Sequence, residues 1–506
     1  MNLGVDCYPF NVPLIDLNQQ GFPSNYDVCV IGAGAAGITL ALELSDAGQK
    51  VLLCEAGDRR FDAASQDAYQ GELTGEKYYE LITARMRYFG GTTNHWAGYC
   101  HPLQEIDFAP RNDLVVPGWP ISYEDIWPHY ERAGQITDLP DNAWDFDGLK
   151  AAAQLPTILG ADSGMDSLAF RWPREFKFRK LYLDQLIATP NVTIALNANL
   201  VDIEFGVASK FVSSAKFKNY NGDTYTASAD KYVIACGGIE NAKLLLNFAD
   251  SHTELMDVAG NIGQYFMEHL CYYNSAYIIT GKQEVEYLQK LVGGQPSDVG
   301  NYQWVAVPNA DARAKHDLAA NVSITLDDTR FFPPDTILAD PVTKGVQSLM
   351  KNTKVSGSDQ IIYCFLRAEQ LPNPESNIQL SDQRDEQGLR RVTLNWGFDP
   401  RDLKSMVGTA GLFGQVIAKQ DLGRVCMTPP DGQSQWTTIY GGYHHMGTTR
   451  MSETAEHGVV DTNCRVHGID NLYMGGSSVF STGGWANPTI NVVAFAVRLA
   501  EHLKQV

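Results

Sequence analysis

The sequence predicts an α/β protein of two interleaved lobes, one formed around a parallel sheet and the other an α+β lobe built on an antiparallel sheet. In segment 26–57 an apolar β-branched run, a glycine-rich turn, a stretch of helical periodicity and a second apolar run follow one another. Two later segments, 231–241 and 471–478, have short apolar runs that end in Gly-Gly, as further strands of the same sheet would. Strand-like alternation in ITLDDT, NIQLSD and RVTLNW, separated by turn residues, predicts the antiparallel sheet.

Segment 26–57 has the order of elements that a Rossmann-type dinucleotide site requires. Its turn, GAGAAG, is a GxGxxG motif, and Glu55 follows the second strand. Gly32 permits the tight turn, Gly34 lets a pyrophosphate approach the backbone, and Gly37 lets the helix pack on the strand. The free N–H groups and the positive dipole end of the helix then face the phosphates. Because Glu55 is anionic, it can accept hydrogen bonds from a ribose and disfavours a 2′-phosphate, which favours FAD or NAD over NADP.

Both lobes are predicted to be assembled from separate stretches of the chain. The stretch after residue 112 is rich in aromatic residues and proline, and the stretch after residue 270 alternates in strand fashion. We expect the active site where the two lobes meet. The predicted nucleotide-binding lobe comprises 23–112, 191–270 and 437–506, and the predicted substrate lobe comprises 113–190 and 271–436.

Composition and charge exclude several classes of protein. The 506 residues are 44% hydrophobic and 19% charged, as in folded globular chains. The sum of 39 basic and 59 acidic residues is −20, a charge that repels phosphate backbones, so we expect no nucleic-acid partner. No basic residue precedes an apolar run at the N-terminus and no stretch reaches membrane-spanning length, which predicts a cytoplasmic protein without membrane contact. The chain has no HExxH or CxxC pattern, so no metal site is predicted.

Four motifs together resemble those of the glucose-methanol-choline (GMC) oxidoreductases, FAD enzymes that oxidise alcohols and sugars. They are DVCVIGAGAAG with its acidic partner, RYFGGTTNHW, IACGGIENAKLLL, and the C-terminal block from HHMGTTRM to NPT. Their order along the chain makes the resemblance specific, and it spans nearly the whole length. It implies a Rossmann-type FAD-binding lobe with an interleaved α+β substrate lobe and FAD as the cofactor.

The resemblance places the catalytic pair in the C-terminal block. The first histidine of the HxxGT motif corresponds to His444, and the second member of the pair, an asparagine before a proline, corresponds to Asn487. A neutral imidazole can remove the hydroxyl proton of an alcohol while hydride leaves the carbon for flavin N5, and an amide can hold the same oxygen. His445, adjacent to the pair, is expected to be structural, as are Glu268 and His269 in GNIGQYFMEH.

GGTTNHW is similar to the segment of pyranose oxidases in which a histidine before tryptophan is bonded to the flavin 8α-methyl. The corresponding residue is His95, although Thr-Asn precede it where pyranose oxidases have Ser-Thr. Two hypotheses therefore stay open: a covalent bond from His95 to FAD, or a histidine that packs on or hydrogen-bonds the flavin. The full predicted cofactor-binding set is Gly32, Gly34, Gly37, Glu55, Gly90, Gly91, Thr93, Asn94, His95, Val201, Gly475, Gly476, Asn487 and Thr489.

The resemblance implies oxidation of a hydroxyl to a carbonyl, with a secondary hydroxyl of a sugar or glycoside as the leading substrate class. The alternatives are a dehydrogenase of a non-sugar alcohol that uses a quinone or protein acceptor instead of oxygen, and a non-oxidative lyase of the same family. Trp119, Trp127 and Tyr130 either stack on a sugar or fill a core. An oligomer is compatible with all of these hypotheses.

Overall fold

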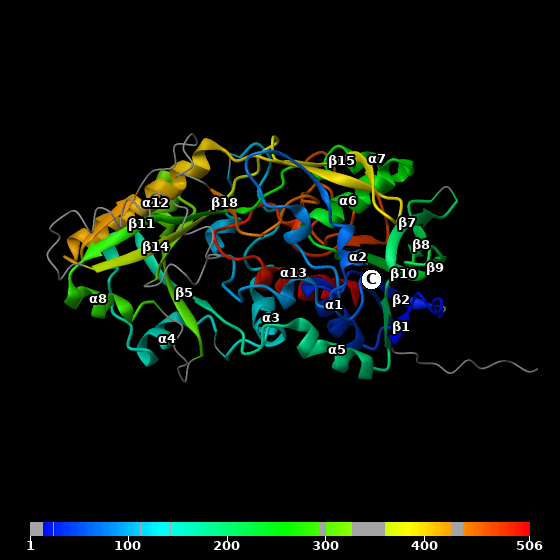
Figure 1. The fold of residues 1–506 in the computed structure, drawn as a ribbon, viewed down its shortest axis with the longest axis horizontal. Helices are drawn as coiled ribbons and strands as arrows, with labels where there is room; N and C mark the ends of the chain where they lie inside the picture. The colour runs from blue at the N-terminus through cyan, green and yellow to red at the C-terminus, as the bar shows by residue number, and fades with distance from the viewer. Residues whose placement is uncertain are drawn as a thin grey trace, which may run out of the picture.

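The computed structural model describes residues 14–23, 25–111, 114–141, 143–207, 209–292, 300–325, 360–427 and 439–506. These residues form an elongated molecule with the two large sheets at opposite ends (Figure 1). The parallel sheet lies near the C-terminus, at the right of the view, and the antiparallel sheet lies at the left. The predicted fold class, with a parallel sheet and an antiparallel sheet in one chain, is confirmed.

The parallel sheet has six strands in the order β1-β6-β3-β2-β10-β19, and every neighbouring pair is parallel. Its strands are rich in apolar residues and largely buried, as parallel strands covered on both faces must be. The two later segments with Gly-Gly ends supply β10 and β19, as predicted. The strands are β1 (Leu14–Asp16), β2 (Tyr26–Ile31), β3 (Val51–Cys54), β6 (Val192–Leu196), β10 (Ala229–Ile234) and β19 (Leu472–Met474).

The antiparallel sheet is ordered β17-β11-β14-β13-β12-β5, and β18 pairs with the first residues of β11. Helix α12 (Pro400–Lys419) packs on β12, β13, β14 and β17. This helix begins with a capping box formed by Asp399 and Asp402, with proline in its first turn. The strands are β5 (Met165–Arg171), β11 (His269–Thr280), β12 (Tyr302–Pro308), β13 (Ala320–Thr325), β14 (Gln360–Glu369), β17 (Arg424–Met427) and β18 (Tyr440–Gly441).

NIQLSD and RVTLNW do not belong to the large antiparallel sheet, contrary to expectation. They form β15 (Asn377–Arg384) and β16 (Arg390–Trp396), and β16 pairs in parallel with β4 (Gly71–Gly75) from the N-terminal part of the chain. Alternation identifies a half-buried strand but not its partner, which explains the difference. Of ITLDDT, the first two residues end β13 and the rest lies outside the described residues. The predicted lobe boundaries stay a prediction.

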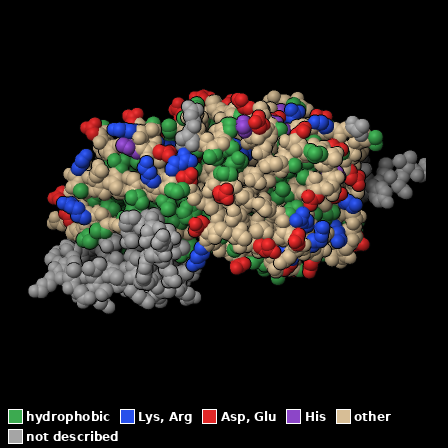
Figure 2. Space-filling view, turned by 90° about the horizontal axis from the view of Figure 1, so that it is seen from above, with side chains coloured by type: hydrophobic (Ala, Val, Ile, Leu, Met, Phe, Trp, Pro, Cys, Tyr) green, Lys and Arg blue, Asp and Glu red, His purple; other side chains and the backbone are tan. Residues whose placement is uncertain are grey.

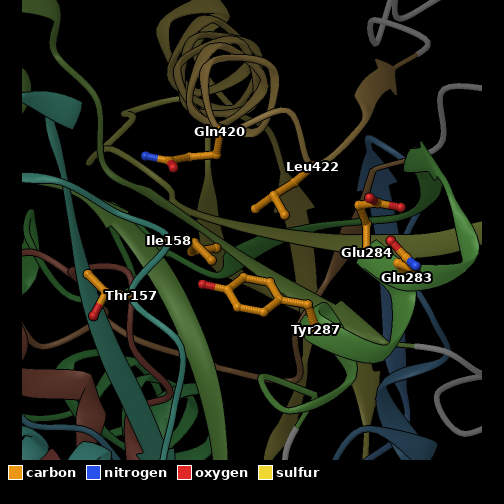
Figure 3. Close-up of a pocket in the computed structure, with 7 residues that line it drawn as sticks. All are labelled: Thr157, Ile158, Gln283, Glu284, Tyr287, Gln420 and Leu422. Carbon is orange, nitrogen blue, oxygen red and sulfur yellow. The ribbon is translucent and has the colours of Figure 1, made fainter.

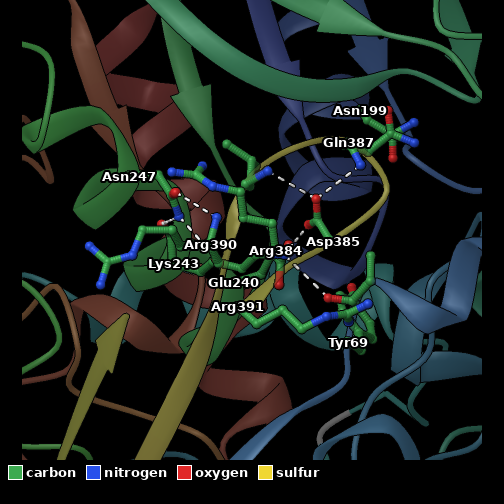
Figure 4. A network of polar contacts seen from close by, with 12 residues as sticks. Tyr69, Asn199, Glu240, Lys243, Asn247, Arg384, Asp385, Gln387, Arg390 and Arg391 are labelled. Carbon is green, nitrogen blue, oxygen red and sulfur yellow. Dashed lines mark hydrogen bonds and ion pairs between the residues drawn. The ribbon is translucent and has the colours of Figure 1, made fainter. Parts of the chain in front are cut away.

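A buried ionic network joins the β15–β16 hairpin to helix α6 (Gly238–Ala249), as Figure 4 shows. Lys243 Nζ lies 2.8 Å from Asp385 Oδ2 and 3.2 Å from Glu240 Oε1, and Arg85 Nη1 lies 3.2 Å from Glu240 Oε2. Burial opposes the charged form of Glu240, but the cations outweigh it and lower the pKa of this carboxyl. The network therefore holds the start of α6 rigidly beside the nucleotide end of the molecule.

The remaining described elements complete the layers. Sheet β7-β8-β9 is a separate antiparallel meander, and none of the described helices is both long and apolar enough to cross a bilayer. Acidic and basic side chains are scattered over the face seen in Figure 2 rather than gathered by sign. These elements are α1 (Ala35–Asp46), α2 (Ala63–Asp67), α3 (Tyr130–Ile136), α4 (Phe146–Ala152), α5 (Phe178–Ala188), α7 (Met256–Ala259), α8 (Lys282–Gln289), α9 (Ala310–His316), α13 (Thr489–Leu503), β7 (Asn199–Phe205), β8 (Val212–Lys218) and β9 (Thr224–Ala227).

Candidate active site

A single elongated cavity of about 590 Å³ connects the carboxyl ends of the parallel strands to the antiparallel sheet. Its walls at the nucleotide end include Gly32, Gly34 and Glu55, and its walls at the other end include His444 and Asn487. Ligands of open α/β sheets bind at the carboxyl ends of the strands, so the position agrees with a nucleotide site. The predicted cofactor motif and the predicted catalytic pair thus face one continuous space.

The glycine turn has the geometry that a dinucleotide requires. A Cβ atom at Gly34 would meet no protein atom within 4 Å, so the backbone there faces open space at the start of α1. At Gly37 a Cβ would lie 1.8 Å from the Gly32 carbonyl oxygen, so only glycine lets α1 pack on the turn. Gly32 itself has a φ of +103°. The open backbone at Gly34 and the helix N-terminus fit the pyrophosphate of FAD.

Glu55 is buried at the end of β3 and lines the same cavity. Its two carboxylate oxygens accept backbone hydrogen bonds from Ala33, at 3.0 Å, and Gly57, at 2.9 Å. Burial raises the pKa of this carboxyl, although these backbone donors oppose the shift. The backbone contacts orient the carboxylate and leave lone pairs on both oxygens for a ribose hydroxyl.

The loop at residues 90–95 passes next to the glycine turn. Gly90 donates its N–H to the Ala33 carbonyl at 2.8 Å, and a Cβ at Gly91 would lie 3.3 Å from the Gly34 Cα. His95 is exposed at the cavity wall, and its Nε2 lies 2.7 Å from the Tyr88 hydroxyl. The loop can therefore hold the cofactor against the turn.

The structure separates the predicted cofactor residues into two groups. The residues that line the cavity are Gly32, Gly34, Glu55, Gly91, Thr93, His95, Gly476, Asn487 and Thr489. The others lie behind the wall and shape it: Gly37, Gly90, Asn94, Val201 and Gly475. On β7 it is Leu200, not Val201, that faces the cavity, and a Cβ at Gly475 would touch the Ala235 side chain at 3.2 Å.

The predicted catalytic residues are in direct contact. Asn487 Nδ2 lies 3.1 Å from His444 Nε2, and Asn487 Oδ1 lies 2.5 Å from Nη1 of Arg367 on β14. A guanidinium can only donate, so the Asn487 oxygen faces Arg367 and its amide N–H₂ faces His444. His444 Nε2 must then be the acceptor of this hydrogen bond.

The hydrogen bonds on the opposite side of the His444 ring indicate the same protonation state. His269, on β11, contacts His444 through a 2.8 Å hydrogen bond between the two Nδ1 atoms, and its Nε2 lies 2.8 Å from the Gly484 carbonyl oxygen. The carbonyl can only accept, so His269 carries its proton on Nε2. Burial and the Arg367 charge lower the pKa of His269 to about 3, so this ring is neutral and its Nδ1 accepts a hydrogen bond from His444 Nδ1–H.

His444 is therefore a neutral imidazole with its lone pair on Nε2, at the cavity. Burial, followed by the neighbouring His269, Arg367 and His445, lowers the pKa of His444 well below its usual value. A neutral ring whose Nε2 carries a lone pair, here held by the Asn487 amide at the cavity wall, is the state that a general base needs.

Glu268 fixes the backbone that carries His444. Its Oε2 accepts N–H groups of Gly442, His444 and His269 at 2.7–3.1 Å, and its Oε1 accepts the hydroxyls of Tyr78 and Tyr79. Burial raises the pKa of Glu268 to about 7, although hydrogen bonds to its carboxylate lower it in part.

The residue before the base adopts a strained conformation. Tyr443 has a φ of +61° and stacks on Tyr79 with ring centroids 3.9 Å apart. Left-handed backbone at a non-glycine residue persists only where its surroundings impose it, and it often marks a functional site. The loop before His444 is thus held in place rather than free.

The adjacent His445 has a different environment from His444. It is buried between Tyr78 and Phe266, and burial lowers the pKa of this ring to about 3. Its Nε2 is 3.7 Å from Glu268 Oε1 and makes no hydrogen bond in the described part of the chain. It lines the cavity without contacting Asn487.

Sequence reasoning missed Arg367 and assigned only a structural role to His269. Both are on strands of the antiparallel sheet, and neither lies in a glycine-rich or HxxGT-type motif. The segment GNIGQYFMEH contained a signal, because it ends in a Glu-His pair at the start of a buried strand.

The aromatic residues considered for sugar stacking lie away from the cavity, two of them in the core. Trp119 packs against Phe480 and Phe495, and the Tyr130 hydroxyl donates to Asn491 in the interior. Trp127 stacks on Tyr123 at the surface, and none of the three lines the cavity.

A second, open hollow of about 250 Å³ lies at the far end of the antiparallel sheet (Figure 3). Tyr287 and Glu284 of α8 face Gln420 and Leu422 beyond the end of α12. It contains none of the predicted site residues.

Comparisons with known proteins identify the family of the chain. An FAD dependent oxidoreductase model matches residues 27–267, and a GMC oxidoreductase model matches residues 372–496. The chain is 24% identical to 6'''-hydroxyparomomycin C oxidase of Streptomyces lividus, over 94% of this chain and 92% of the relative. It is 23% identical to 2-methyl-1,2-propanediol dehydrogenase of Mycolicibacterium austroafricanum, over 95% of each chain.

The solved structures support the fold. Pyridoxine 4-oxidase from Mesorbium loti superposes with a TM-score of 0.62 at 18% identity, over 94% of this chain and 99% of that one. Formate oxidase of Aspergillus oryzae superposes with a TM-score of 0.60 at 15% identity, over 95% and 98%. The two family models, together with a glycine turn that fits the pyrophosphate of FAD, show that the chain is an FAD-dependent oxidoreductase of the GMC family.

Proposed function

We propose that this oxidoreductase converts a hydroxyl group to a carbonyl, with a secondary hydroxyl of a sugar or glycoside as its substrate class. The observation that carries the proposal is the unprotonated Nε2 of His444, which faces the cavity 3.1 Å from the Asn487 amide. The names of several relatives support the sugar class: paromamine 6'-oxidase, fructose dehydrogenase large subunit and pyranose 2-oxidase.

The chain's own groups would handle the hydroxyl proton and orient the substrate. The substrate oxygen would lie beside both His444 Nε2 and Asn487 Nδ2, and its hydroxyl would replace the Asn487 amide as the hydrogen-bond donor to Nε2, which then accepts the hydroxyl proton. Asn487 donates a hydrogen bond to the same oxygen and stabilises the negative charge that develops on it. Bound FAD supplies the hydride acceptor. The protonated His444 keeps its Nδ1 hydrogen bond to His269, so the ring does not need to move when it gains charge.

His444 and Asn487 are the proposed catalytic residues. Gly32, Gly34, Glu55, Gly91, Thr93, His95, Gly476 and Thr489 are proposed to contact FAD, because they line the cavity.

The electron acceptor is proposed to be oxygen or a quinone. Relatives are named both as oxidases and as dehydrogenases. Reduced enzyme that is reoxidised rapidly in air would identify an oxidase, whereas slow reoxidation with fast dye reduction would identify a dehydrogenase.

A non-sugar alcohol is the second candidate substrate, because 2-methyl-1,2-propanediol dehydrogenase matches the chain over nearly its full length. A screen that includes diols as well as sugars separates the two candidates.

The test is an anaerobic flavin-reduction screen across sugars, glycosides, diols and simple alcohols. We expect at least one to bleach the flavin absorption band, and His444→Ala to slow that reduction by about 10²- to 10⁴-fold, the usual contribution of a general base. FAD content should be unchanged. His316→Ala, an exposed histidine at the end of α9, is the matched control. Absence of bleaching by every compound would reject the proposal and favour a non-oxidative reaction.

A further inference from the structure

Arg367 places a buried positive charge in the substrate end of the cavity. The side chain, on β14, is 6% exposed and lines the cavity beside Asn487. Nη1 donates to Asn487 Oδ1 at 2.5 Å. The guanidinium lies 4.9 Å from the Phe365 ring centroid and 5.8 Å from those of Tyr99 and Phe170. Aromatic faces offset part of the cost of burying a cation, but they do not neutralise it.

No carboxylate in the described part of the chain forms an ion pair with Arg367. The buried acids of this region are engaged elsewhere: Glu369 pairs with Arg111 at 2.8 Å and Asp107 with Arg313 at 2.5 Å. Glu268 accepts the five donors described above.

The Nε atom of Arg367 is also buried without a hydrogen-bond partner in the described residues. A guanidinium has five N–H donors, and only the bond to Asn487 uses one of them. A buried cation with unused donors is costly unless an anion pairs with it. An anion that enters the cavity would therefore find a charge and several hydrogen-bond donors already in place.

We propose that Arg367 binds a carboxylate carried by the alcohol substrate, so that the preferred substrates are sugar acids or other hydroxy acids. The proposal rests on the proposed function and deepens it. Asn487 lies between the two groups, with its oxygen on Arg367 and its nitrogen on His444. A substrate carboxylate bound to Arg367 and a substrate hydroxyl facing His444 would therefore be separated by about the width of the Asn487 side-chain amide. The same charge works against cationic amino sugars.

The first test measures anion binding without turnover. Holoenzyme is titrated with acetate and with acetamide, its neutral isostere, while the visible flavin spectrum is recorded. We expect acetate to perturb the spectrum with saturation and acetamide to bind at least tenfold more weakly. Arg367→Gln keeps a donor for Asn487 but loses the charge, so acetate affinity should fall about 10- to 100-fold, the usual range for a charged hydrogen bond.

Two further variants make the result specific. Arg367→Lys keeps the charge as a point donor and should retain part of the acetate affinity. Arg424→Gln, an exposed arginine on β17 of the same sheet, should match the wild type. Equal binding of acetate and acetamide, or unchanged acetate affinity in Arg367→Gln, would overturn the proposal.

The second test compares glucuronate, glucose and glucosamine, which differ in charge, as reductants in the anaerobic assay. We expect the half-saturating concentration to be lowest for the acid and highest for the amine. In Arg367→Gln the three half-saturating concentrations should become similar. A wild-type preference for glucosamine over glucuronate would overturn the proposal. If no alcohol reduces the flavin, the proposed function fails, while the acetate titration still decides whether Arg367 binds anions.

Discussion

His269 Nδ1 and His444 Nδ1 lie 2.8 Å apart, and the Gly484 carbonyl on the far side of His269 determines which ring donates. Because His269 must donate to that carbonyl from Nε2, it can only accept from His444. The main-chain oxygen of Gly484 thus selects the tautomer of the proposed base two hydrogen bonds away. Gly484 is itself held by a 3.0 Å hydrogen bond from its N–H to Glu369.

His269 is expected to act as a positioning residue. His269→Leu removes the acceptor of His444 Nδ1–H and lets His444 populate the tautomer with its proton on Nε2, so flavin reduction should slow by about 10- to 100-fold. His269→Gln offers an amide oxygen to His444 and should recover most of the rate. The diagnostic measurement is the ¹⁵N NMR spectrum of His444, which should show Nδ1 protonated in the wild type and mixed protonation in His269→Leu. Unaltered ¹⁵N shifts would mean that His269 has only a packing role.

The pH dependence of flavin reduction should report the lowered pKa of His444. Burial and the neighbouring His269 and Arg367 keep this ring neutral below pH 6.5. As the pH is lowered, protonation of His444 should therefore reduce the rate with a neutral alcohol only well below pH 6.5. In Arg367→Gln the loss of a nearby cation favours the protonated ring, so the midpoint should move to higher pH. Stopped-flow reduction at several pH values measures both profiles.

Glu268 is a second group of the site that can affect the pH profile, because burial raises the pKa of its carboxyl to about 7. A fall centred near pH 7 would report Glu268, and Arg367→Gln should leave it in place because Arg367 does not contact Glu268. A wild-type midpoint near neutral pH that Arg367→Gln moves to higher pH would report His444 itself and contradict its lowered pKa.

Gly34→Ala should separate cofactor binding from folding. A Cβ at this position meets no protein atom within 4 Å, so the free energy of unfolding should change by no more than about 1 kcal/mol. The added methyl group would occupy the open space where the pyrophosphate approaches, and FAD affinity, measured by flavin fluorescence, should fall at least tenfold. Gly160→Ala is a matched control, because Gly160 also precedes a helix and faces open space. Full FAD content in Gly34→Ala would place the pyrophosphate elsewhere.

The two hypotheses for His95 can be distinguished by acid precipitation. Nε2 of His95 is hydrogen-bonded to the Tyr88 hydroxyl at 2.7 Å, and a covalent bond from this atom to the flavin would have to replace that hydrogen bond. We therefore expect noncovalent FAD, which a colourless pellet and a yellow supernatant would show. A yellow pellet that becomes colourless in His95→Ala would establish a covalent bond instead.

Local sequence predicted the strands of this fold but not their partners or which residues face the cavity. The Gly-Gly ends of β10 and β19 correctly predicted strands of the parallel sheet, yet of Gly475 and Gly476 only the second lines the cavity. Alternation predicted both β15 and β16 but not that β16 pairs with β4, more than 300 residues earlier in the chain. Period and residue type describe the faces of a strand, whereas its partner depends on contacts across the whole fold.

The sequence by itself predicted the nucleotide turn, because the geometry of that short stretch is local, and its resemblance to the GMC family predicted His444 and Asn487 as the catalytic pair. Only the tertiary structure decided the protonation and charge of the site. His269 comes from β11, Gly484 from the loop before α13, and Arg367 from β14, and their donors and acceptors meet only when the chain is folded. A hydrogen bond requires an approach of about 3 Å between two specified atoms. No spacing along the chain encodes that approach between residues on separate strands.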